Sequence, residues 1–262
     1  MAMATPGPIR VVFWQATLFR RFWVSNLLAS FVQPLLYLLG LGVGVGALVD
    51  RNAHSADALG GVSYVAYISP GLMVTTAMAV ASIESLWPIL GNFLWNRAYH
   101  GISATPLGPA DIVGGHALWM ALRCTVTSAA VAVVLVLFPD ARDWALVPAV
   151  AVSALTGVAF AMPLMAFAAT RDLDGSFPAM QRFVIVPLFL FGGAFYPISQ
   201  LPGWLQAVIK VLPLWHGVEL ARGFSVGGAS GSQTLTHVGV LLLWSAVGSL
   251  LAYRFIRRRL YV

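Results

Sequence analysis

Residues 144–170 read WALVPAVAVSALTGVAFAMPLMAFAAT, a run of 27 residues without a charged side chain. An α-helix rises about 1.5 Å per residue, so about 20 apolar residues cross a hydrocarbon core of about 30 Å. The run is therefore long enough for one membrane crossing. Similar charge-free runs occupy 22–49, 58–83, 183–209 and 223–253.

The composition agrees with this interpretation. Of 262 residues, 59% are hydrophobic and 9% are charged, against roughly 45–50% and about 25% in soluble domains. So few charges cannot cover the surface of a soluble domain. The composition therefore excludes that class and predicts an all-α polytopic membrane protein with one transmembrane domain over 1–262.

We expect six crossings, one for each of the charge-free runs and one for the apolar stretch that contains His116 and Arg123. They lie at 26–49, 63–83, 112–138, 144–170, 178–196 and 234–254. The first run is too long for the apolar region of a signal peptide, so we expect it to remain as an anchor.

The basic residues predict the topology. With both termini in the cytoplasm, ten of the arginines fall on the inside and only three arginines and Lys210 fall outside, which follows the positive-inside rule. The net charge of +6 therefore marks topology in a plasma-membrane protein, and we expect no nucleic-acid partner.

Two kinds of segment do not fit simple crossings. In 9–23, Arg10, Trp14, Thr17 and Arg21 recur at helical spacing, which predicts a helix in the cytoplasmic interface; the alternative is a basic flank of the first crossing. In 197–222, prolines divide an apolar stretch into pieces too short to span, so we expect outer re-entrant helices.

Several motifs that suggest enzymes lack the rest of their chemistry. A P-loop needs Lys followed by Ser or Thr, but the only lysine, Lys210, precedes Val211. The glycines at 40, 42, 44 and 46 favour close helix packing over a nucleotide loop. The GxSG at 228–231 has no suitable histidine on another helix, and the single Cys124 excludes a cysteine metal cluster. We expect no catalytic, cofactor or metal site.

Polar residues inside apolar segments are the remaining candidates for a functional role. His116, Met120, Arg123 and Thr127 share one helix face, and Glu84 is the expected partner of Arg123, with Arg97 as a competitor. The face either forms an interhelical network or belongs to a substrate path. A further cluster, His216, Glu219 and Arg222, is expected to satisfy itself near the outer interface or to contact substrate at the exit.

Two longer motifs carry a resemblance. The first is WNRAYHGISATPL at 95–107, followed by DIVG at 111–114. The second is PLFLFGGAFYPI at 187–198, followed by LP at 201–202, LPL at 212–214, Glu219 and Arg222. At these two places, and over nearly the whole chain, the sequence resembles ABC-2 type transporter permeases, nearest to the branch of nodulation-factor (lipo-oligosaccharide) and drug exporters.

The resemblance implies a permease that works with two copies of a separate ABC ATPase, which bind ATP and Mg, and with a second permease, the same or related. It implies that 96–107 forms a cytoplasmic coupling helix against the ATPase, beside a connecting helix at 9–23. The implied coupling residues are Asn96, Arg97, Tyr99, His100, Ile102, Thr105 and Leu107. Candidates for the translocation path are Phe31, Tyr37, Phe189 and Phe195, with Arg123.

The expected function is export of an amphipathic molecule from the cytoplasm or inner leaflet, either a lipid-linked saccharide (a lipo-oligosaccharide) or a hydrophobic drug. The alternative is a secondary transporter of hydrophobic solutes without an ATPase. That class would need carboxylates near the middle of the membrane or two repeated halves. We find no such carboxylate and no clear repeat in the sequence.

Overall fold

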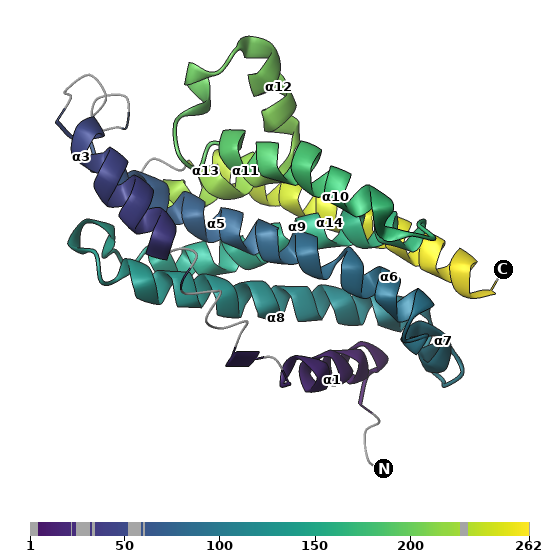
Figure 1. Ribbon diagram of the computed structural model, residues 1–262. Helices are drawn as coiled ribbons and strands as arrows, with labels where there is room; N and C mark the ends of the chain where they lie inside the picture. Colours follow the sequence, from purple (N-terminus) through teal and green to yellow (C-terminus); the bar gives the residue numbers. More distant parts are fainter. Residues whose placement is uncertain are drawn as a thin grey trace.

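The computed structural model describes residues 5–21, 23–24, 32, 35–51, 59, 61–225 and 230–261. Within these residues the chain is helical and contains no strand, which confirms the predicted fold class (Figure 1). Short 3₁₀ turns connect some of the helices, at Pro139–Ala141, Asp174–Ser176 and Ile198–Gln200.

Four helices are long and apolar enough to cross a membrane. They are α5 (Tyr64–Glu84) continued by α6 (Trp87–Leu94), α8 (Pro109–Leu135), α9 (Leu146–Ala169) and α14 (Gly231–Tyr261). They pack against one another as an elongated bundle (Figure 1), with α9 in contact with α5, α8 and α14. Four of the predicted crossings therefore have a matching helix.

The segment formed by α5 and α6, which matches the predicted crossing at 63–83, is longer than predicted. The helix bends at Ser85 and Leu86, ahead of Pro88, and then continues as α6. Proline lacks an N–H and is tolerated in the first turn of the new helical piece. Glu84 is the last residue of α5 and lies where the two helical pieces meet, and its position relative to a membrane stays a prediction.

The first and fifth predicted crossings match less completely. Of 26–49, the structure describes a helix over Leu35–Val49, with a π-helical stretch at Leu38–Val45 that leads into α3 (Gly46–Val49); most of 26–34 lies outside the described residues. A Cβ added at Gly42 would lie 3.3 Å from Val65 of α5, and one at Gly46 would lie 3.6 Å from Tyr64, so α5 packs closely at this glycine pair, whereas a Cβ at Gly40 would meet nothing within 4 Å.

The helix in place of the fifth crossing covers 177–191 as α10 (Phe177–Met180), a π-helical stretch (Gln181–Ile185) and α11 (Val186–Phe191). At about 1.5 Å per residue it is too short to cross about 30 Å. It ends before Gly193, whose φ of +88° is a conformation that favours glycine. The total of six crossings thus stays a prediction.

The segment predicted to be re-entrant, 197–222, forms two helices at one end of the bundle. Helix α12 (Gly203–Val211) projects away from the long helices (Figure 1), whereas α13 (Pro213–Ser225) packs against α5, α9 and α14. Leu212 lies between the two helices, and Pro213 begins α13. Their position relative to a membrane stays a prediction.

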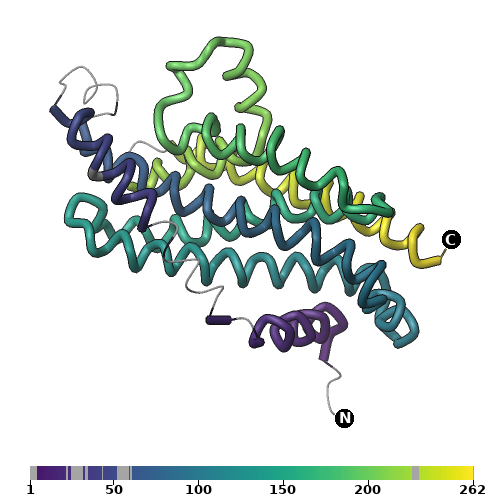
Figure 2. Tube along the Cα trace, in the orientation of Figure 1, coloured from purple at the N-terminus to yellow at the C-terminus, as the bar shows by residue number. Residues whose placement is uncertain are grey.

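At the other end lie α1 (Gly7–Phe19) and α7 (Ala98–Ser103), with the C-terminus nearby (Figure 2). Helix α1 runs along the first half of α8. Val11 is buried against Gly115, where any side chain at residue 115 would collide with it. This contact fixes α1 beside α8 although the two helices are nearly 100 residues apart in sequence.

Candidate functional site

Helix α7 is the short helix that the sequence predicts within 96–107. Arg97 has a left-handed backbone, with φ of 48° and ψ of 25°, and turns the chain between α6 and α7. Tyr99 is fully buried, and its ring lies 4.9 Å from that of Phe93 and 6.4 Å from that of Trp14 in α1. Burial raises the pKa of the Tyr99 phenol, so it stays neutral. Tyr99 is therefore the anchor of α7.

The other proposed coupling residues lie around this anchor. The exposed side chains are Asn96, Arg97, His100 and Thr105, while Ile102 and Leu107 are half-buried. The Thr105 hydroxyl donates to the Ile102 carbonyl (2.7 Å) and accepts from the Leu107 N–H (3.3 Å). Helix α7 thus presents a polar surface on a fixed aromatic base.

Arg123 and Glu84 form the ion pair expected from the sequence. Arg123 Nη2 and Nε lie 2.7 and 2.8 Å from Glu84 Oε1, and Trp119 Nε1 donates to Oε2 at 3.2 Å. The guanidinium carbon of Arg123 also lies 4.3 Å from the ring centroid of Phe19. Three helices, α1, α5 and α8, therefore meet at this pair.

The predicted polar face of α8 is buried throughout, at His116, Met120, Arg123 and Thr127. His116 Nε2 lies 3.0 Å from the Ser85 hydroxyl, next to Glu84. Part of this region opens into a cavity of about 570 Å³ whose walls include Phe19, Glu84, His116 and Trp119. His116 and Arg123 on this face therefore join an interhelical polar network, and His116 also lines the cavity.

Three of the candidate residues for the translocation path, Tyr37, Phe189 and Phe195, lie together at a second cavity, away from Arg123. Tyr37 and Phe189 have ring centroids 5.4 Å apart, and Phe195 lies 5.3 Å from Phe189. All three line this cavity, which has a volume of about 570 Å³ and lies between the helix at 35–49, α5 and α11. Arg123 is not among its lining residues, and Phe31 lies outside the described residues.

The predicted outer cluster divides into two. In one part, Arg222 Nη1 pairs with Glu219 Oε1 at 2.7 Å, and Nη2 donates to the carbonyl of Gly193 at 2.7 Å. The Arg222 guanidinium also stacks on the Tyr67 ring, 4.0 Å from its centroid. Arg222 thus holds the break after α11 against α5 and α13.

In the other part, His216 turns away from Glu219. Its Nε2 donates to the Lys210 carbonyl (2.8 Å), and its Nδ1 lies 2.8 Å from Nδ1 of His237 in α14. Trp215 packs on both imidazole rings. Our expectation that His216, Glu219 and Arg222 satisfy one another is therefore wrong for His216, because α14 brings a second histidine to it.

No set of three His, Cys, Asp or Glu side chains is placed to hold a metal ion within the described part of the chain. The sequence analysis also missed residues that complete these clusters. The missed residues are Trp14, Phe93, Trp119, His237 and Arg259. Each contacts a residue on another helix, as Phe93 does with Arg259, so the spacing within one helix carries no signal for them.

Comparison with known proteins places this arrangement in a family. The family model for "ABC-2 type transporter" matches residues 9–224. Nodulation protein J of Rhizobium leguminosarum bv. trifolii is 33% identical over 90% of this chain and 87% of its own length. Nodulation protein J of Rhizobium meliloti is 32% identical with the same coverage, and the inner membrane transport permease YadH of Escherichia coli is 25% identical over 92% and 90%. The chain belongs to the ABC-2 type transporter family.

Proposed function

We propose that this chain is the membrane subunit of an ATP-driven exporter in the plasma membrane, with both termini in the cytoplasm. The observation that carries the proposal is α7, a short helix with exposed polar residues at the end of two long apolar helices, anchored through Tyr99 on α6 and α1. A rigid helix of this kind can receive movement from a partner and pass it on to the bundle.

The partner we propose is an ABC ATPase in two copies, which binds the ATP and Mg. This chain contains no P-loop, so the hydrolysis belongs to the partner. The contact surface is formed by the exposed residues of 96–107, among them Arg97, His100 and Thr105, with α1 beside them. A second permease, identical or related, completes the unit.

The substrate class we propose is amphipathic, a lipid-linked saccharide such as a lipo-oligosaccharide or a hydrophobic drug. The aromatic cavity of Tyr37, Phe189 and Phe195 suits an apolar chain. Its position beside the helix at 35–49 and α11 makes it the candidate path, with surrounding membrane lipid as the route of entry. The outer pairs at His216 and Arg222 lie near the proposed exit.

The alternative, a secondary transporter, would need a carboxylate that can hold a coupling ion. Glu84, at the end of α5 within the apolar segment Tyr64–Leu94, is the carboxylate to consider. However, Arg123 and Trp119 occupy both of its oxygens, so it is a poor site for a coupling ion. The contacts of Glu84 favour a structural role over ion coupling.

Affinity purification of the tagged chain from the membranes of its host tests the proposal. We expect an ABC ATPase to co-purify in a 1:1 ratio with the permease and to be lost when Arg97→Glu and His100→Glu are combined, because both side chains are exposed on α7. Gln233→Glu, exposed at the start of α14, is the control. A stable chain that carries solute but never retains an ATPase would favour the secondary transporter.

A further inference from the structure

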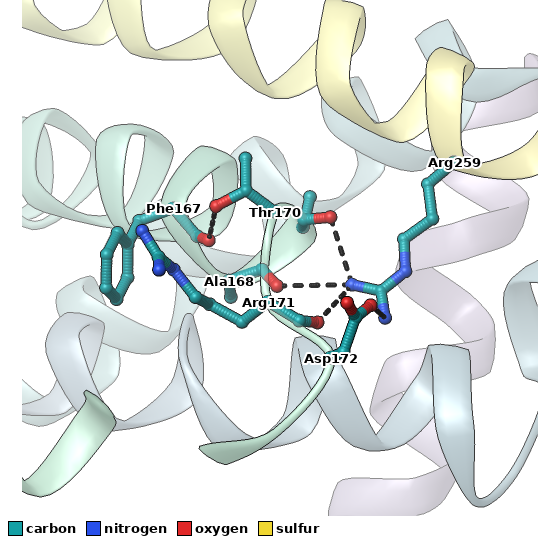
Figure 3. A network of polar contacts seen from close by, with 7 residues as sticks. Phe167, Ala168, Thr170, Arg171, Asp172 and Arg259 are labelled. Atoms are coloured by element: carbon teal, nitrogen blue, oxygen red, sulfur yellow. Dashed lines mark hydrogen bonds and ion pairs between the residues drawn. The ribbon is translucent and has the colours of Figure 1, made fainter. Parts of the chain in front are cut away.

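Arg259 differs from the other arginines at the end of α14. Arg254, Arg257 and Arg258 are exposed, whereas Arg259 is half-buried. Figure 3 shows its side chain crossing from α14 to the end of α9. An arginine that serves only the positive-inside rule can stay in solvent. The half-buried side chain of Arg259 therefore indicates an additional role.

The guanidinium of Arg259 caps α9. Its Nη1 donates to the carbonyls of Ala169 (3.0 Å), Ala168 (3.5 Å) and Arg171 (Figure 3). The last carbonyls of a helix have no partner within the helix, and cationic side chains stabilise that end. The contact to Asp172 (3.4 Å) adds little, since that carboxylate is 98% exposed.

The same guanidinium also contacts the base of α7. Its carbon lies 4.6 Å from the ring centroid of Phe93, which is buried in α6. Phe93 packs edge-to-face on Tyr99 and on His100, at 4.9 and 6.2 Å between ring centroids. Arg259 therefore lies between the aromatic base of α7 and the end of α9.

The contacts of Arg259 connect α7 to two helices, α9 and α14, that do not adjoin α7 along the chain. Helix α7 follows α6 and precedes α8 directly, so movement of α7 reaches those two helices through the backbone. Helices α9 and α14 are not sequence neighbours of α7. Helices α6 and α8 pack on α9, and α7 itself contacts α14; to this packing Arg259 and Phe93 add a polar and aromatic link between the base of α7 and the ends of α9 and α14.

We infer that Arg259 is a positioning residue that joins the proposed coupling helix α7 to the cytoplasmic ends of α9 and α14. The inference rests on the proposed function, because it assigns the transmission of ATPase movement to a particular side chain. Arginine suits this position because its planar fork can donate to several carbonyls while its face stacks on an aromatic ring.

Hydrogen–deuterium exchange on the permease–ATPase complex tests this. The variants are Arg259→Gln, which removes the charge and the stacking, Arg259→Lys, which keeps only the charge, and the exposed neighbour Arg258→Gln as the control. Without nucleotide, we expect the amides at the end of α9 in Arg259→Gln to exchange about tenfold faster than in the wild type, because charge-assisted hydrogen bonds are lost. The control should match the wild type.

The decisive readout is the response to ATP and vanadate, which trap the ATPase. In the wild type we expect exchange to change both over 98–103 and over 164–172. In Arg259→Gln the change should persist over 98–103 and be lost over 164–172, with the same amount of ATPase bound. Arg259→Lys should give an intermediate loss, and it replaces Arg259→Gln if that variant fails to fold.

The outcomes separate the inference from the proposed function. If 164–172 responds to trapping in the Arg259 variants as in the wild type, or if Arg258→Gln loses the response equally, the positioning role is wrong and the proposed function stands. A wild-type preparation that binds no ATPase, or whose 98–103 segment ignores the nucleotide, contradicts the proposed function and the inference together.

Discussion

Arg123 of α8 and Glu84 of α5 form an ion pair with 2.7 Å between Nη2 and Oε1, inside two helices that are candidates to cross the membrane. The Arg123 side chain is only 6% exposed and that of Glu84 23%. An unpaired charge at the centre of a membrane-spanning helix costs on the order of 3 kcal/mol on insertion scales. The pair, together with Trp119 and Phe19, therefore fixes how α1, α5 and α8 meet.

Glu84→Gln should destabilise the protein by about 3–5 kcal/mol, because Arg123 is left buried without its counter-charge. The double variant Glu84→Gln with Arg123→Met removes both charges and should regain most of that loss. Unfolding midpoints of the purified protein in detergent compare the two. A double variant no more stable than the single one would show that the pair itself, and not the unpaired charge, determines the effect.

Gly71→Ala should weaken the packing of α5 against the segment after α11. A Cβ at residue 71 would lie 2.8 Å from the Ala194 Cα and 2.9 Å from its carbonyl oxygen, so the segment after α11 must move. Overpacking of this kind costs about 1–3 kcal/mol. Gly239→Ala in α14 is the matched control, since a Cβ there meets nothing within 4 Å. Equal unfolding midpoints for the two variants would contradict the close approach of α5 and residue 194.

The His216–His237 contact predicts a stability that depends on pH. Burial lowers the pKa of His216 from its ordinary value of 6.5. The folded chain then binds this proton less readily than the unfolded chain, so the contribution to stability is complete above pH 6.5 and is lost as the pH falls toward the folded pKa.

We therefore expect a lower unfolding temperature at about pH 5.5 than at about pH 7.5, and a smaller difference in His216→Gln. His100→Gln, at an exposed position on α7, should keep the full difference. A pH dependence that His216→Gln leaves unchanged would assign it to other groups.

The sequence predicted best what depends on hydrophobicity along one helix. The charge-free run at 144–170 became α9 with nearly the same bounds, because nothing but membrane or core can accept so long an apolar helix. The same reasoning placed His116, Arg123 and Thr127 on one buried face of α8, since helical periodicity determines which residues share a face.

It predicted less well where tertiary contacts override local signals. The predicted crossing at 63–83 matches α5, but nothing in the sequence pattern indicated that a second helix, α6, continues from it after a break at Ser85 and Leu86. His216 pairs with His237 because α13 and α14 pack together, and that contact leaves no mark in the spacing of either helix. The inward turn of Arg259 among exposed arginines depends likewise on α9 ending beside it.

We propose that α7 transmits work from an ATPase to the bundle. Tyr99→Ala removes the anchor of α7 on Phe93 and Trp14, whereas Tyr99→Phe keeps the ring contacts. The measurement is ATP-dependent export of a lipo-oligosaccharide from inside-out vesicles, divided by the ATP hydrolysed. We expect this ratio to fall at least about tenfold in Tyr99→Ala and to stay near wild type in Tyr99→Phe, because truncating a buried aromatic costs several kcal/mol of packing. An unchanged ratio in Tyr99→Ala, with the protein folded and the ATPase bound, would show that the anchored α7 does not transmit this work.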